Sequence, residues 1–144
     1  MRSNDQQINR AIISEHDIGS TFFRIYENRI FHVTVRQGEM VTMKIVREGH
    51  DFLNRNGGGE YYNLYEFQAF SEVEPEVREW AASPSNNNYT ILDAIVISSL
   101  PQKILADYYI RYNKSSKPTR IFNSIDKAIV WIDEVMSGYE KIAV

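Results

Sequence analysis

The sequence of 144 residues has no cysteine and few histidines. The absence of cysteine excludes a disulfide scaffold, a cysteine-ligated zinc site and a thiol nucleophile. The three histidines, His16, His32 and His50, lie far apart and form none of the short spacings of metal-binding motifs. The residues therefore predict no metal site, no cofactor and no assembled catalytic group. We expect His32 to lie on the less buried face of a strand.

A positive charge excess and a long apolar run are also missing. Lys and Arg number 16 against 19 Asp and Glu, a net charge of −3, whereas nucleic-acid-binding domains usually carry a clear positive excess. The longest apolar run, residues 94–97, has the length of a strand, and residues 11–13 are too few for a signal peptide or a membrane span. We expect a cytoplasmic protein that neither binds nucleic acid nor spans a membrane.

The length is that of one domain. The first 18 residues are polar and aperiodic, so we expect residues 1–18 to be a flexible segment. Residues 19–138 should then form a single α/β domain, and residues 139–144 a tail after Gly138 ends the last helix.

Hydrophobic patterning gives the order of the elements. It predicts a leading hairpin of residues 21–26 and 30–35, with Asn28 at a turn position that favours positive φ. Further strands are expected at residues 61–67, 94–97 and 119–122, and helices at residues 43–54, 75–82, 101–112 and 125–136. Thr42 and Ser99 are the predicted N-caps of the first and third helices. The alternation predicts a mostly parallel mixed sheet of about five strands with about four helices.

The C-terminal part carries a family resemblance. Residues 119–132 form a short strand ending in Phe122, then a helix with Ala128 and with Trp131 before an aliphatic residue. With the leading hairpin, this string resembles the STAS or SpoIIAA-like domains of anti-sigma-factor antagonists, including a group of SpoIIAA-like proteins from Bacteroidetes-type bacteria. The resemblance covers residues 21–135 and implies a SpoIIAA-like fold and a non-enzymatic regulatory or protein-interaction function.

The same resemblance implies a contact region. In the signalling members, a partner kinase phosphorylates a serine in an Asp-Ser-Ser-Gly-like stretch near the second helix. Here the corresponding residues 67–74 contain one hydroxyl, Ser71, with Glu72 and Glu74 beside it and without that Asp or Gly. Those carboxylates would repel a phosphate that a helix N-terminus would attract, so phosphorylation stays an open question. The implied partner is an anti-sigma-kinase-like protein or a second copy of the chain.

Two serines follow the central predicted strand, where ligands collect in open α/β sheets. Ser98, Ser99 and Gln102 therefore mark the edge of a pocket for a lipid or metabolite, which is the alternative function. A serine nucleophile is a third interpretation, but the sequence has no Gly-x-Ser-x-Gly motif and no histidine near the pair.

Charge is unevenly distributed along the chain. Residues 60–79 contain six acidic residues and one basic residue, a net charge of −5, and residues 101–120 contain five basic residues and one acidic residue, a net charge of +4. Two solvated faces of opposite sign account for this pattern, and a docking surface, for a partner or for self-association, is the alternative.

Overall fold

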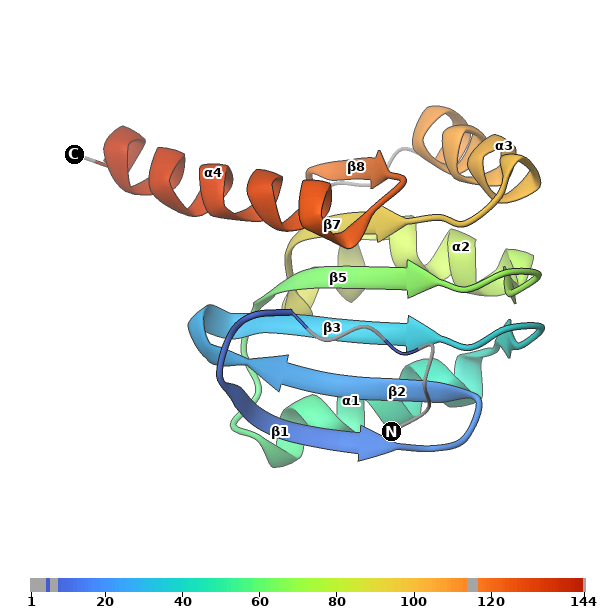
Figure 1. Cartoon of the computed structure of the whole chain (residues 1–144), viewed down its shortest axis with the longest axis horizontal. Helices are drawn as coiled ribbons and strands as arrows, with labels where there is room; N and C mark the ends of the chain where they lie inside the picture. Colours follow the sequence, from blue (N-terminus) through green and yellow to red (C-terminus); the bar gives the residue numbers. More distant parts are fainter. Residues whose placement is uncertain (1–4, 6–7, 114–116, 144) are drawn as a thin grey trace.

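A computed structural model describes residues 5, 8–113 and 117–143. A mixed sheet forms its centre, with helices on both faces (Figure 1). The six strands lie in the order β1-β2-β3-β5-β7-β8 and comprise β1 (Ile12–Asp17), β2 (Thr21–Tyr26), β3 (Ile30–Val35), β5 (Tyr61–Phe67), β7 (Thr90–Val96) and β8 (Thr119–Phe122). A second, small sheet pairs β4 (Met40–Val41) with β6 (Glu72–Val73).

Four α-helices complete the fold: α1 (Met43–Arg55), α2 (Pro75–Ala82), α3 (Leu100–Tyr108) and α4 (Ile125–Ala143). A π-helical turn, Tyr109–Asn113, continues α3, and short 3-10 turns occupy Glu27–Arg29 and Pro84–Tyr89. Strands β1 to β3 are antiparallel, and β3, β5, β7 and β8 are parallel. None of the helices in the described ranges combines the length and apolar content that crossing a bilayer requires.

The predicted fold class is confirmed: a leading hairpin, alternating helices and strands, and a mostly parallel sheet. The tip of the hairpin contains Asn28 at φ +64°, a left-handed conformation that Asn tolerates better than most residues. The Thr42 hydroxyl accepts a hydrogen bond from the Ile45 backbone N–H, as expected of an N-cap. Helix α2 begins at Pro75, as the expected range of residues 75–82 has it.

Three expected boundaries are wrong. Residues 12–17, expected within a flexible segment, form the edge strand β1. This strand pairs with β2 through backbone hydrogen bonds, so its side chains can be polar and lie in solvent. Helix α4 continues past Gly138 to Ala143, because one glycine costs a helix only about 1 kcal/mol. Strand β7 begins at Thr90 rather than near residue 94, so it includes polar residues before its apolar run.

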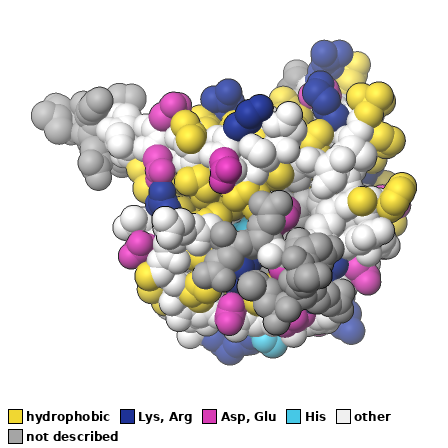
Figure 2. All heavy atoms as spheres, viewed as in Figure 1, with side chains coloured by type: hydrophobic (Ala, Val, Ile, Leu, Met, Phe, Trp, Pro, Cys, Tyr) yellow, Lys and Arg dark blue, Asp and Glu magenta, His cyan; other side chains and the backbone are white. Residues whose placement is uncertain are grey.

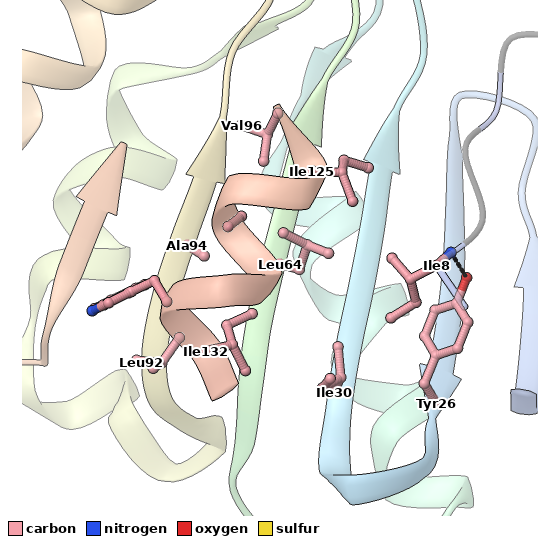
Figure 3. Close-up of a cluster of buried hydrophobic side chains, with 11 residues drawn as sticks. Ile8, Tyr26, Ile30, Leu64, Leu92, Ala94, Val96, Ile125 and Ile132 are labelled. Atoms are coloured by element: carbon pink, nitrogen blue, oxygen red, sulfur yellow. Dashed lines mark hydrogen bonds between the residues drawn. The ribbon is translucent and has the colours of Figure 1, made fainter. Parts of the chain in front are cut away.

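Helix α4 covers β5 and β7 on one face of the sheet (Figure 3). Leu64, Leu92 and Ala94 are fully buried there against residues of α4 such as Ile132. Burial on both faces explains why residues 94–97 show no polar alternation. Beside α4, the Tyr26 hydroxyl accepts a hydrogen bond of 3.3 Å from the Ile8 backbone N–H, which fixes part of the N-terminal segment over β2 and β3.

Helix α1 packs on the opposite face against an aromatic cluster. Phe23, Phe31 and Phe52 have ring centroids 5.9 to 6.2 Å apart and are almost fully buried. Gly49 of α1 lies over this cluster, and a Cβ placed on it would be 3.3 Å from Cε1 of Phe23. The missing side chain thus lets α1 approach β2 closely.

Candidate functional site

A cavity of about 210 Å³ lies between the sheet and helices α1, α2 and α3. The sheet contributes lining residues such as Phe31, Tyr65 and Ile95, and the helices contribute apolar residues such as Ile45 and Val77. The volume exceeds the roughly 150 Å³ of an engineered apolar cavity that binds benzene. The cavity is therefore large enough for a small organic molecule, and its lining is mostly apolar.

Two polar side chains from neighbouring strands meet in the cavity lining. Asn63 of β5 lies opposite Asp93 of β7 in the parallel register. The Asn63 Nδ2 donates to Asp93 Oδ1 and to Thr90 Oγ1, both at 3.1 Å. The Asn63 Oδ1 is buried and has no hydrogen-bond partner in the described part of the chain. A buried acceptor of this kind costs free energy unless a partner reaches it.

Burial changes the ionisation of the groups around this pair. It raises the pKa of the Asp93 carboxyl to about 6, although the hydrogen bond from Asn63 acts in the opposite direction. Among the described residues, Asp93 has no ion-pair partner. Burial also raises the pKa of Tyr65, and the charges of Asp93 and Tyr109 add to that rise. On α1, burial lowers the pKa of His50, whose ring stacks on Tyr89 at 4.2 Å.

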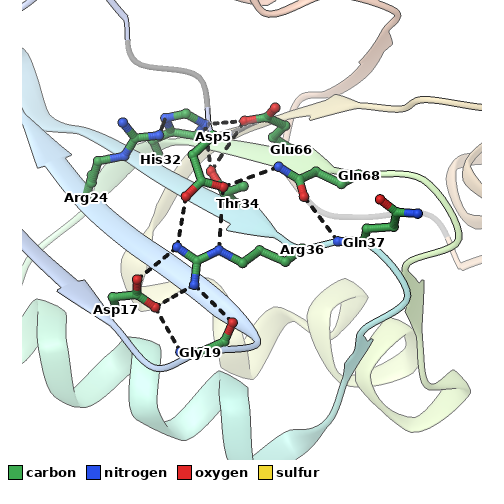
Figure 4. Close-up of polar contacts among 10 residues, drawn as sticks. All are labelled: Asp5, Asp17, Gly19, Arg24, His32, Thr34, Arg36, Gln37, Glu66 and Gln68. Carbon is green, nitrogen blue, oxygen red and sulfur yellow. Dashed lines mark hydrogen bonds and ion pairs between the residues drawn. The ribbon is translucent and has the colours of Figure 1, made fainter. Parts of the chain in front are cut away.

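The other face of the sheet holds a second group of polar residues, all buried except Asp17 and here called the polar network (Figure 4). It comprises Asp5, Asp17, Arg24, His32, Thr34, Arg36, Glu66 and Gln68. Arg36 is 2% exposed and donates to Asp5 Oδ2 at 2.8 Å and to Asp17 Oδ2 at 2.9 Å. These hydrogen bonds hold the pKa of Arg36 above its usual value. The network holds Asp5 against the sheet.

His32 lies at the centre of the polar network. Its Nε2 is 2.9 Å from Glu66 Oε1, and its Nδ1 is 3.2 Å from Arg24 Nη2. Because arginine only donates and a carboxylate only accepts, these contacts fit a neutral imidazole with the proton on Nε2. Burial lowers the pKa of His32, and the Arg24 charge lowers it further against the effect of Glu66. The expectation that His32 lies on a less buried face is wrong, since the residue is fully buried.

A family model called Domain of unknown function (DUF7793) matches residues 23–136. The chain belongs to the DUF7793 family. No curated protein matches this DUF7793 chain. It is similar to the crystal structure of an uncharacterised protein of the DUF3478 family with a SpoIIAA-like fold, from Shewanella loihica PV-4. The TM-score is 0.48 at 8% sequence identity, and the match covers 88% of this chain and 98% of that chain.

In this DUF7793 protein, the residues expected at the ligand edge form a cluster. Gln102 lines the cavity, and its Nε2 donates to the backbone oxygens of Gln68 and Ser71 at 2.9 and 3.1 Å. Ser98 donates from its hydroxyl to the Phe67 carbonyl at 2.6 Å. Ser99 accepts from the Gln102 backbone N–H at 3.4 Å, so its predicted role as the N-cap of α3 is confirmed.

The residues expected at a partner contact differ in exposure. Ser71 is 2% exposed, and its hydroxyl donates to the Gln68 carbonyl at 2.7 Å, so a kinase could not reach it in this conformation. Glu72 is exposed and Glu74 is half-buried. Phe70, which the sequence did not single out, is 78% exposed and has φ +62°, an unfavourable conformation for a bulky residue.

The structure does not bring the histidines to the serines. His16 is exposed on β1, His32 belongs to the polar network, and His50 stacks on Tyr89. In the described ranges, no hydrogen bond joins Ser98 or Ser99 to a histidine. The same ranges contain no group of three His, Cys, Asp or Glu residues suited to a metal ion.

The sequence missed Asn63, Tyr65 and Asp93 as site residues. The available signal was a polar residue beside an apolar run expected to be covered on both faces: Asp93 directly precedes residues 94–97. Such a residue must either have a buried partner or line a cavity. The pairing of β5 with β7, which brings Asn63 to Asp93, is not visible in the sequence.

Proposed function

We propose that this protein binds a small, largely apolar molecule in the cavity between the sheet and helices α1, α2 and α3, as a carrier or sensor. The observation that carries the proposal is the buried Asn63–Asp93 pair in a mostly apolar lining. Ligand sites are typically apolar hollows with a few convergent polar groups. A group with a shifted pKa in such a hollow is a candidate binding residue.

Helix α3 supplies a route into the cavity. Leu105 is 43% exposed and also lines the cavity, so the cavity reaches the surface beside α3. None of the residues Leu100–Tyr108 is fully buried, which means that little packing holds the helix in place. Its outer side also carries exposed apolar residues, including Ile104 and Tyr108 (Figure 2, upper right, over α3). A helix with apolar residues on both sides suits an entrance for an apolar molecule.

Titration of isotope-labelled protein with toluene, followed by amide NMR, tests this proposal. Toluene should shift the amide signals of Asn63 and Asp93, which line the cavity. It should leave unchanged the signal of Val130, which lies on α4 outside the cavity. The variant Ala106→Phe puts a larger side chain on the wall formed by α3 and should abolish the shifts. Ala81→Phe, from α2, should have the same effect.

Ile104→Phe is the matched control, because it adds the same ring to the same helix at a 60% exposed position that does not line the cavity. It should leave the toluene response intact. The proposal fails if toluene causes no shifts, or if both blocking variants respond as the wild type does. Native mass spectrometry of protein isolated from its host then identifies a retained ligand by its added mass.

A protein-interaction function is the second candidate, centred on Phe70, Glu72 and Glu74. It is favoured by one observation: a bulky aromatic side chain held in solvent by a strained backbone beside acidic residues. A backbone conformation of this kind costs about 1–3 kcal/mol and is found most often at functional sites, which favours a binding role for the exposed Phe70 side chain. A partner would need an apolar pocket with basic residues around it.

Affinity capture from the host with matched variants tests the second candidate. Partners that use this region should be lost with Phe70→Ser and with the charge reversal of Glu72 and Glu74 to Lys. They should be retained with Glu79→Lys, which reverses an exposed charge on α2 outside the region. Retention of every captured protein by the first two variants would rule out this contact.

A further inference from the structure

Asp93 is a buried carboxylate that lines the mostly apolar cavity and has no ion-pair partner among the described residues. Resting on the function proposed above, we propose that the ligand carries an amino group, which binds as an ammonium ion to the Asp93 carboxylate among the aromatic residues of the cavity. The ligand class is therefore a small apolar amine. Asp93 thus determines the polar end of the ligand, whereas the cavity volume limits only its size.

The hydrogen bonding of Asp93 leaves room for a ligand donor. Its Oδ1 accepts one hydrogen bond from Asn63 Nδ2 at 3.1 Å. A carboxylate can accept about four hydrogen bonds. Burial of a carboxylate with so few donors is unfavourable unless a positive charge lies beside it. In the part of the chain that the structure describes, no ion pair with Asp93 occurs.

The aromatic lining suits a cation as well. Tyr65 and Tyr109 line the cavity and lie close enough to Asp93 and to each other for their charges to influence Tyr65. The faces of aromatic rings attract ammonium groups within about 6 Å, most strongly where water is excluded. A carboxylate beside tyrosine rings combines charge pairing with this attraction. The apolar lining residues, such as Phe31 and Ile95, would contact the hydrocarbon part of the ligand.

Within the described residues, none of the other ionisable side chains lining the cavity forms an ion pair with Asp93. Glu72 is exposed, and Arg78 is half-buried and donates to the Val73 carbonyl at 2.7 Å. His50 is uncharged at neutral pH, because burial lowers its pKa. Asp93 is thus the buried charge of the cavity, and an anion there would be repelled. An alcohol could donate to Asp93 but would leave its negative charge unneutralised.

Three probes of matched size separate this inference from the proposed function: 2-phenylethylamine, 2-phenylethanol and phenylacetate. Calorimetric titration of the full chain near neutral pH should give an affinity for the amine about tenfold or more above that for the alcohol, with phenylacetate weakest. Asp93→Asn should reduce amine affinity by about tenfold and change alcohol affinity by less than about threefold. Glu79→Gln, the matched control, removes an exposed carboxylate of α2 that does not line the cavity and should change amine affinity by less than about twofold.

The binding of the three probes distinguishes failure of the amine preference from failure of the cavity as a ligand site. Equal binding of amine and alcohol, abolished by Ala106→Phe, would support the cavity as a ligand site and overturn the amine preference. An amine preference that survives Asp93→Asn would also overturn the inference, because another group would then hold the ammonium. Failure of all three probes to bind would contradict both the cavity function and its ligand class. Circular dichroism of each variant verifies that it is folded.

Discussion

The two faces of the central sheet bury charge in different ways. On the face of the polar network, Arg36 meets Asp5 and Asp17, and His32 meets Glu66. On the cavity face, Asp93 has the Asn63 amide and no ion pair within the described residues. Paired charges hold a buried network together, whereas a buried charge without an ion pair costs free energy and is commonly found at binding sites. The difference supports the proposal that the cavity face binds a ligand.

The largest expected effect comes from breaking the paired face. Arg36→Met removes the cation between Asp5 and Asp17 and leaves buried carboxylate charge unneutralised. We expect a loss of about 3–5 kcal/mol in the free energy of unfolding, measured with urea near neutral pH. Arg10→Met is the control, because its partner Asp133 is 47% exposed, and its loss should stay below about 1 kcal/mol. Equal losses in the two variants would contradict the importance of the network.

The next largest effect has the opposite sign and occurs on the cavity face. Folding raises the Asp93 pKa from 3.8 to about 6, so the folded protein loses stability as pH rises between these values. Asp93→Asn should therefore stabilise the protein near neutral pH, by at most roughly 3 kcal/mol, and give little gain near pH 4. Urea unfolding across this pH range checks the prediction. A gain independent of pH would show that the charge of Asp93 is not its cause.

The histidines provide a pH dependence of the opposite sign. Burial lowers the folded pKa of His32 below the unfolded value of 6.5, so its contribution is present above that pH and is lost as pH falls. His32→Gln should therefore weaken the loss of stability on acidification, while lowering stability near neutral pH through lost hydrogen bonds. His50→Gln should also weaken the acid loss, since burial lowers its pKa too. Unchanged acid dependence in His32→Gln would contradict the neutral, buried imidazole.

The smallest effect concerns the helix beside the cavity. Ser99→Ala removes the N-cap of α3 and should cost about 1 kcal/mol in the free energy of unfolding. Ser98→Ala, its neighbour, removes an exposed hydrogen bond to Phe67 and should cost less. Amide hydrogen exchange along α3 should rise more in the first variant than in the second. A larger effect of Ser98→Ala would mean that its bond to β5, rather than the cap, holds the helix.

Local patterns in the sequence predicted the elements, because alternation and capping depend on neighbouring residues. The hairpin turn at Asn28 and the caps at Thr42 and Ser99 are examples. Strand β1 was missed because pairing of an exposed edge strand depends on its partner rather than on its own side chains. His32 was misplaced for a related reason, since its buried partners, such as Glu66, come from other elements of the fold.

The cavity could be predicted only in part. Gln102 was expected at the ligand edge and is a lining residue, whereas Ser98 and Ser99 are used in local hydrogen bonds. The remaining lining residues come from elements far apart in the sequence, and helix packing determines the space between them. A polar residue such as Asp93 beside a buried strand was the available clue, but its partner Asn63 depends on strand pairing.

Strand β5 serves both faces, because Asn63 and Tyr65 line the cavity while Leu64 and Glu66 point to the opposite side. Successive side chains of a strand point to opposite faces of the sheet, so inserting or deleting one residue in β5 would move its cavity-facing side chains to the other face and the others into the cavity. Glu66 would then face the cavity, and His32 would lose its acceptor. The three glycines at residues 57–59, all at positive φ, can instead accommodate changes in chain length before the strand begins. Length variation should therefore be tolerated at these glycines and should disrupt both faces at once a few residues later.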